Sequence, residues 1–233
     1  MFPDTPSLLY GHTVTQRIAA RKGRRYAGMP PGARLAARRE RLLDAGLELF
    51  GTRGYGATSI GALCRAAKVA PRSFYEAFPG REALLAALLD RLAREQLEAV
   101  ADAIARRPPD DVEARARAGL DAFARVLTGD ERKARVQLVE AVGVSPALER
   151  RRRAAIHAFA DLVAAEIIRL GRARAIPGRP DEDVALAALA LVGAAGELLV
   201  DWVHAPPGAR LPVERLVGEC VRLFVASAGA GGA

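Results

Sequence analysis

Apolar residues recur at helical spacing from Leu35 to near the C-terminus, whereas residues 1–33 are rich in proline and glycine and show no sustained period. A first amphipathic stretch ends at the glycines around Tyr55, and two shorter apolar stretches follow at 58–67 and 71–78. No stretch alternates with the two-residue period of a strand. The pattern predicts an all-α fold with about nine helices.

Longer helices are predicted beyond Pro79-Gly80. Their expected ranges are 81–107, 110–127, 130–142, 146–172, 181–204 and 212–226. The chain therefore divides into four parts. These are a disordered arm (1–33), a compact three-helix unit (34–80), a helical domain (81–228) and a flexible tail (229–233).

The two short helices are expected to pack through one apolar face. Thr58 is placed to cap the first, since its hydroxyl can accept a backbone hydrogen bond, and Pro71 suits the first position of the second. The inward residues are Ile60, Leu63, Cys64, Ala67, Val69, Phe74 and Phe78. The outward residues of the second helix are then Arg72, Ser73, Tyr75, Glu76 and Ala77. This is the arrangement of a helix-turn-helix, whose second helix enters the major groove of DNA.

The outward side chains suit a DNA duplex. Arginine bonds guanine in bidentate fashion, glutamate accepts from cytosine, and tyrosine or serine holds phosphates. An ordinary helical hairpin with a solvated polar face has the same spacing. The spacing alone therefore leaves both interpretations open.

Charge is concentrated at one end of the chain. The net charge is +8, and residues 1–41 carry nine basic side chains against Asp4 and Glu40. Such an end suits a polyanion such as nucleic acid or an acidic membrane, but a solvated tail that keeps the protein soluble has the same composition. In front of a helix-turn-helix, Arg17 to Arg25 become candidates for a minor-groove arm.

Other classes of protein find little support in the sequence. Two cysteines and three scattered histidines form no metal-ligand or triad motif, so neither a metal nor another cofactor is expected. The N-terminus has no secretory pattern. The longest strongly apolar run, Val184 to Gly196, is too short to span a bilayer. We therefore expect a cytoplasmic protein that is not an enzyme and does not enter a membrane.

Residues 38–84 strongly resemble the N-terminal domain of the TetR family of bacterial transcriptional repressors. The shared motifs are L-F-x-x-x-G-Y-x-A-T-S-I, the turn A-A-x-V, F-Y-x-x-F and R-E-A-L, in register over about 47 residues. The resemblance implies a DNA-binding helix-turn-helix, and it places Arg81 beside a backbone phosphate. The predicted DNA contacts are Thr58, Ser59, Lys68, Arg72, Ser73, Tyr75, Glu76 and Arg81.

Three positions depart from the family pattern. Lys68 stands where the family commonly has glycine, and a left-handed lysine costs on the order of 1 kcal/mol. Ala70 replaces the usual serine and cannot cap the second helix. Glu76-Ala77 replaces a histidine or aromatic residues, so Glu76 must either find a cytosine or pair with Arg72.

For the remaining helices the resemblance implies a small-molecule effector site and a homodimer interface. The predicted pocket residues are Phe123, Leu127, Gln137, Glu140, His157 and Phe159. The last two helices are the predicted dimer interface. On the first of them a small-residue face runs from Ala185 to Gly196. On the second, the expected apolar stripe is Leu216, Val217, Cys220, Leu223 and Phe224.

The sequence thus predicts a dimeric repressor that a small molecule releases from its double-stranded DNA operator. One alternative is a TetR-like regulator that has no small-molecule pocket and is controlled by a protein partner. An enzyme with an appended DNA-binding domain and a membrane-surface protein that uses the basic arm are further alternatives.

Overall fold

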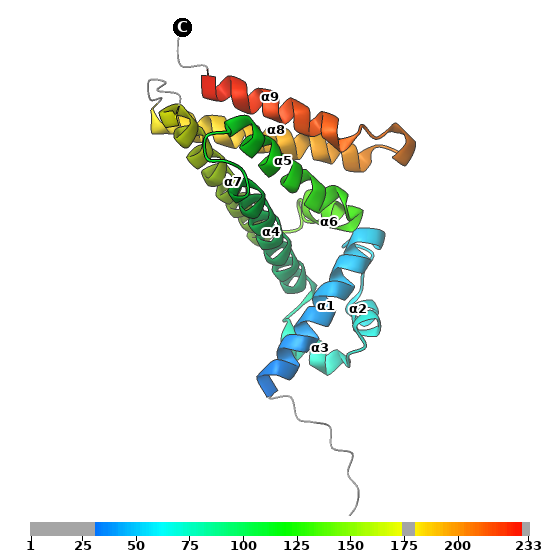
Figure 1. Ribbon diagram of the computed structural model, residues 1–233. Helices are drawn as coiled ribbons and strands as arrows, with labels where there is room; N and C mark the ends of the chain where they lie inside the picture. Colours follow the sequence, from blue (N-terminus) through cyan, green and yellow to red (C-terminus); the bar gives the residue numbers. More distant parts are fainter. Residues whose placement is uncertain (1–30, 174–179, 230–233) are drawn as a thin grey trace, which may run out of the picture.

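The computed structural model describes residues 31–173 and 180–229, and every regular element within these ranges is helical (Figure 1). The predicted N-terminal arm and C-terminal tail lie almost wholly outside the described residues. In chain order the elements are α1 (Pro31–Arg53), α2 (Ile60–Ala67), α3 (Pro71–Ala77), α4 (Arg81–Ala105), α5 (Val112–Thr128), α6 (Glu131–Arg135), the π-helix η1 (Val136–Glu140), α7 (Pro146–Ala173), α8 (Asp181–His204), the 3₁₀ turn η2 (Pro207–Ala209) and α9 (Val213–Gly229). The all-α prediction is confirmed.

Helices α1, α2 and α3 form a small unit, here called the head (residues 31–80), at one end of the molecule (Figure 1). Its core contains the fully buried Leu42, Phe50, Leu63 and Phe74. The first turns of α4 belong to the same core, through residues such as Leu84. Since burying one such side chain contributes about 1.5–3 kcal/mol, this shared core fixes α4 to the head.

The body (residues 81–229) is built from α4 to α9, with α8 and α9 side by side at the end away from the head (Figure 1). By length and composition, Glu182–His204 is apolar enough to cross a membrane, with a mean hydropathy of 1.9. The apolar stretch is therefore longer than the run from Val184 to Gly196 that was expected from the sequence. Buried residues such as Val184, Ala188 and Leu199 pack this helix inside the body, yet only 33% of its apolar window is buried. One face of α8 is thus left uncovered by the chain itself.

The predicted helix 130–142 is interrupted. It begins as α6 and changes at Val136 into one turn of π-helix, in which Ala141 N donates to Val136 O at 3.2 Å. The prediction of one uniform helix was wrong, because apolar spacing does not distinguish a π turn from an α turn. Single π turns inside α-helices are frequently found at functional sites.

The same segment joins the body to the head. Arg132 of α6 pairs with Glu48 of α1 at 2.5 Å, and Glu140 Oε2 accepts a hydrogen bond from Tyr55 N at 2.7 Å. Gly51 permits this approach, since a Cβ there would lie 2.5 Å from Arg132 Cβ. The head is therefore held at two places, by α4 and by the segment α6–η1.

Candidate functional site

The start of α2 differs from the prediction in one respect. Ser59, not Thr58, is the cap, and Ser59 Oγ accepts from Ala62 N at 3.2 Å. Thr58 is buried, and its hydroxyl donates to Gly54 O at 2.8 Å. The prediction that Thr58 caps α2 was therefore wrong. Because its hydroxyl points inward, Thr58 supports the turn instead of presenting that group to a phosphate.

The turn between α2 and α3 follows the prediction. Lys68 has φ 53° and ψ 48°, in the left-handed region, and Lys68 N donates to Arg65 O at 3.2 Å. Its side chain is exposed. Ala70 makes no side-chain cap, and Pro71 occupies the first turn of α3. The expected strained lysine and missing cap are both confirmed.

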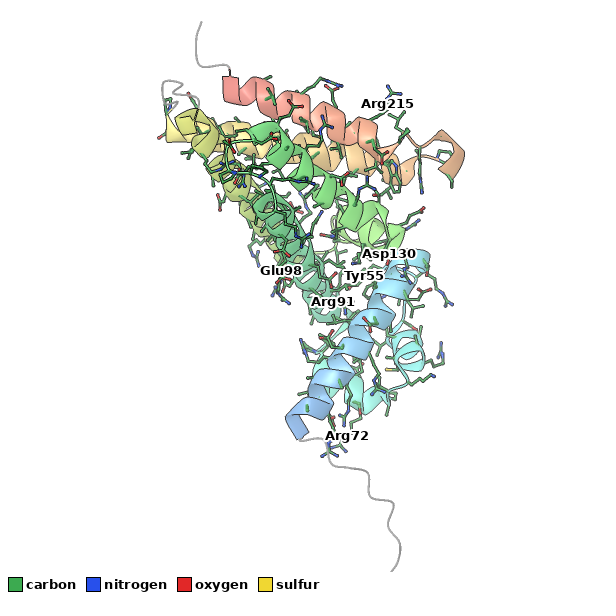
Figure 2. All side chains as sticks on the ribbon, in the orientation of Figure 1. Tyr55, Arg72, Arg91, Glu98, Asp130 and Arg215 are labelled. Atoms are coloured by element: carbon green, nitrogen blue, oxygen red, sulfur yellow. The ribbon has the colours of Figure 1, made fainter. Side chains whose placement is uncertain are left out.

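Helix α3 presents a mainly polar face to solvent. Arg72, Tyr75 and Glu76 are exposed, and Ser73 is half-buried. Figure 2 shows Arg72 at the outer end of the head. Ala77 was predicted to be exposed and is buried, because it lies one turn from Phe74 on the inward face, and Ala77 O accepts from Arg39 Nη1 at 2.5 Å.

Glu76 holds two arginines on this face. Its Oε1 lies 3.4 Å from Arg72 Nε, and its Oε2 accepts from Arg38 Nη1 at 2.9 Å. The expected pairing with Arg72 is confirmed. Arg38 was missed as a neighbour of this face, since it lies 38 residues away in the sequence. Glu76 is the one acidic residue of α3, and it holds Arg38 and Arg72 beside the exposed face of this helix.

Arg81 is turned toward the head. Its guanidinium donates to Tyr55 O at 2.9 Å and also to Thr58 O, and it lies 4.8 Å from the centre of the Tyr55 ring. Burial raises the pKa of Tyr55, although the positive charge of Arg81 acts in the opposite direction. Arg81 therefore fastens the start of α4 to the loop before α2, and these bonds would have to be shared with any phosphate.

The body contains an apolar cavity of about 50 Å³ among α4, α5, α7, α8 and α9. Phe123 and Phe159 line it, and their rings meet edge to face with centres 5.0 Å apart. Arg115 and Glu166 also line it, joined by two hydrogen bonds of 2.7 and 3.0 Å. No local sequence pattern indicates this pair, because its members are 51 residues apart.

Glu166 has a further partner in Arg169, whose Nη2 donates to it at 2.8 Å. Burial disfavours the charged form of Glu166, but the hydrogen bonds from Arg115 and Arg169 outweigh it and lower the pKa of Glu166. The carboxylate is therefore ionised at neutral pH. It closes one side of the small cavity as part of an ion network.

A second cavity, of about 270 Å³, lies beside η1 and is also bordered by α4, α5, α7 and α8. Phe123, Leu127, Gln137 and Phe159 line it, so four of the six predicted pocket residues meet in one place. His157 does not join them: it is exposed beside a separate hollow between α7 and α8. Glu140 lines neither cavity and contacts the head instead.

The described part of the chain contains no group of three or more His, Cys, Asp or Glu side chains that could hold a metal ion. Cys64 and Cys220 are both buried and unpaired, and burial raises the pKa of each thiol.

Comparison with known families places the head. Residues 42–88 match the family model described as bacterial regulatory proteins of the tetR family. The head therefore belongs to the tetR family of bacterial regulatory proteins. No curated protein sequence matches it.

Solved structures of TetR-family and other regulators share the fold over most of the chain. The transcriptional regulator FadR from Bacillus subtilis, solved in complex with stearoyl-CoA, has a TM-score of 0.70 at 18% identity, covering 81% of this chain and 98% of FadR. A TetR-like regulator from Rhodococcus sp. RHA1 has a TM-score of 0.64 at 21% identity, covering 87% of this chain and 100% of the other. At such identities the likeness shows the fold alone.

Six of the eight predicted DNA contacts have exposed or half-buried side chains, namely Ser59, Lys68, Arg72, Ser73, Tyr75 and Glu76. Thr58 and Arg81 instead make hydrogen bonds that hold the loop before α2.

Proposed function

We propose that the protein is a dimeric repressor that binds an operator through two heads and leaves it when a small molecule enters the body. Acting on bacterial DNA, it would work in the cytoplasm. The observation that carries this proposal is the coexistence, in one chain, of an exposed recognition face on α3 and a ligand-sized cavity joined to the head through η1.

The proposed DNA contacts come from the face described above. Arg72 and Tyr75 are exposed at the start and middle of α3, where the recognition helix of a helix-turn-helix meets base edges. Ser59 and Lys68 would reach phosphates from α2 and the turn. Arg38 joins them, because Glu76 holds it beside α3. The arm at 1–28, which lies outside the described residues, is proposed to add phosphate contacts.

The proposed dimer interface is formed by the outer faces of α8 and α9. Only part of the stripes named from the sequence is available for it, because Ala188, Val192, Ala195, Leu216, Val217, Cys220 and Phe224 are buried within the chain. The exposed members are Ala185 and Gly193 on α8 and Leu223 on α9, and Leu186, 65% exposed, adds to the outer face of α8. An apolar helix with so much exposed surface favours a partner, and a two-fold axis would match a palindromic operator.

Release by a ligand requires that the ligand prefer one of two head arrangements. The head is attached through α4 and through α6–η1, and both elements border the cavity beside η1 or lie next to it. A ligand that moves either element would change the spacing of the two heads. The presence of this cavity favours regulation by a small molecule over regulation by a protein partner alone. Since FadR is described with stearoyl-CoA, acyl compounds are one class to test.

The proposal is tested by selecting bound fragments from genomic DNA and measuring operator affinity at several salt concentrations. We expect a palindromic sequence, two chains per site and an affinity that falls as salt rises. Binding that is equal for all fragments, or one chain per site, would refute it. Compounds suggested by the genes beside the operator are then tested for release.

A further inference from the structure

The cavity beside η1 has the size of a small ligand. Its volume of about 270 Å³ corresponds to roughly nine water volumes and approaches the lower end of the range for ligand pockets. Its walls are mostly apolar, with Phe123, Leu127, Ile156 and Phe159 among them. A molecule that fills it would therefore be mainly apolar and of about ten non-hydrogen atoms.

One polar group in this wall has no hydrogen-bond partner within the described chain, namely the amide nitrogen of Gln137. Gln137 Nε2 is buried, and leaving such a donor unpaired is destabilising. Gln96 lines the same cavity but is already satisfied, since its Nε2 donates to Phe123 O at 2.9 Å. Gln137 thus carries an unpaired donor in this wall, and a rotation of its side chain would present that donor to a ligand in the cavity.

The charged residues at the cavity favour an uncharged ligand. Arg152 is held by two hydrogen bonds of 2.8 and 2.9 Å to Glu149. Glu197 is exposed to solvent. A carboxylate would have to compete with Glu149 for Arg152, whereas a carbonyl oxygen needs only the amide of Gln137.

Gln137 also has a direct connection to the head. It lies on the π-helix η1, three residues before Glu140, which accepts the hydrogen bond from Tyr55 N. Glu140 also lies against Gly54, whose φ is +88°. This five-residue segment therefore lines the cavity with Gln137 and Leu138 and contacts the head with Glu140.

We propose that this cavity binds an uncharged, mainly apolar molecule with one carbonyl acceptor, that the acceptor is bound by Gln137 Nε2, and that η1 transmits binding to the head through Glu140. The ligand assignment stands on the cavity and Gln137 alone. The transmission step rests on the proposed function.

The probe is 2-nonanone, compared with nonanoate and nonylamine, which have the same chain length and opposite charges. Binding to the full-length protein without DNA is measured by titration calorimetry. We expect the ketone to bind more tightly than either charged compound. The variant Gln137→Met should weaken ketone binding about 3- to 10-fold, the factor that one neutral hydrogen bond contributes.

Two further variants make the result specific. Leu211→Ala changes an exposed apolar residue that does not line the cavity and should leave ketone affinity nearly unchanged. Gln137→Glu replaces the donor by a carboxylate and should reverse the preference toward nonylamine. Thermal melts confirm that each variant is folded. No ketone binding, equal binding by Gln137→Met, or a preference for nonanoate would overturn the ligand assignment.

The transmission step is tested separately with Glu140→Ala. This variant should bind 2-nonanone as the wild type does, because Glu140 does not line the cavity, but the ketone should no longer change its operator affinity. Ketone-induced release that persists in Glu140→Ala would overturn transmission through Glu140. A wild-type protein that selects no operator would instead refute the proposed function, while the calorimetry would still decide the ligand assignment.

Discussion

The head and the body bury their side chains differently. Phe50, Phe74 and Phe78 of the head are all fully or almost fully buried, and the first half of α4 completes the same core. The body contains several cavities and a π turn, and it leaves the Gln137 amide nitrogen without a partner. A surface that reads DNA must keep a fixed geometry, which close packing provides. A region that binds a ligand needs space, and it contributes less stability around that space.

The largest expected effect comes from opening the core of the head. Phe74→Ala removes a fully buried ring that packs on Phe78, so it should lower the free energy of unfolding by about 3–5 kcal/mol. The neighbouring Tyr75→Ala removes a ring that is 58% exposed and should cost less than about 0.5 kcal/mol. Chemical denaturation of both variants measures the difference. Equal losses would show that the head is not the closely packed unit described here.

The next largest effect is expected from the ion network of the body. Glu166→Gln removes the charge that holds Arg115 and Arg169 and should cost about 1.5–3 kcal/mol. Because the pKa of Glu166 is lowered in the folded state, its contribution is present above the pKa of an unfolded glutamate, about 4.3, and is lost as the pH falls below it.

The pH dependence distinguishes this network from simple packing. Unfolding free energies at pH 7 and pH 3.5 should differ less in Glu166→Gln than in the wild type. Exposed pairs provide the control: Asp102→Asn, which breaks the surface pair with Arg106, should change neither value appreciably. If the unfolding free energy of Glu166→Gln depended on pH as strongly as that of the wild type, the ion network would not be the source of this pH dependence.

A third prediction concerns the binding of DNA by the head. Arg72 is 92% exposed in its side chain, so Arg72→Ala should leave stability unchanged and weaken operator binding by about 1–3 kcal/mol if the guanidinium reads a base. Arg106→Ala removes the same charge from the body and serves as the control. Gel-shift titrations with the selected operator compare them. Equal affinity of the two variants would exclude Arg72 as a base contact.

The difference between head and body also explains what the sequence could predict. The inward residues of α2 and α3 follow from spacing over a few residues, so Phe74 and Phe78 were predicted correctly. The strained Lys68 was expected from the resemblance to the TetR family, which commonly has glycine there. Thr58 and Ser59 are adjacent polar residues that both suit a cap, and only the position of Leu49 O and Gly54 O turns Thr58 inward. In the body, Glu140 and His157 carry suitable chemistry, but the packing of distant helices decides which side chains meet. No local pattern reports the π turn or the Arg115–Glu166 pair.

The smallest expected effect separates backbone from side chain at Lys68. Its φ of 53° is unfavourable for any residue with a Cβ, so Lys68→Gly should raise the free energy of unfolding by about 0.5–1 kcal/mol. Lys68→Ala keeps the Cβ and should give no such gain.

Both variants lose the ammonium group, so if Lys68 binds a phosphate both should weaken operator binding and reduce the salt slope by about one. Denaturation curves and binding at several salt concentrations measure the two properties independently. A glycine variant that is more stable and binds DNA less well would show that a strained lysine is retained there for its charge. Unchanged DNA binding in both variants would leave the left-handed lysine without a role in DNA contact.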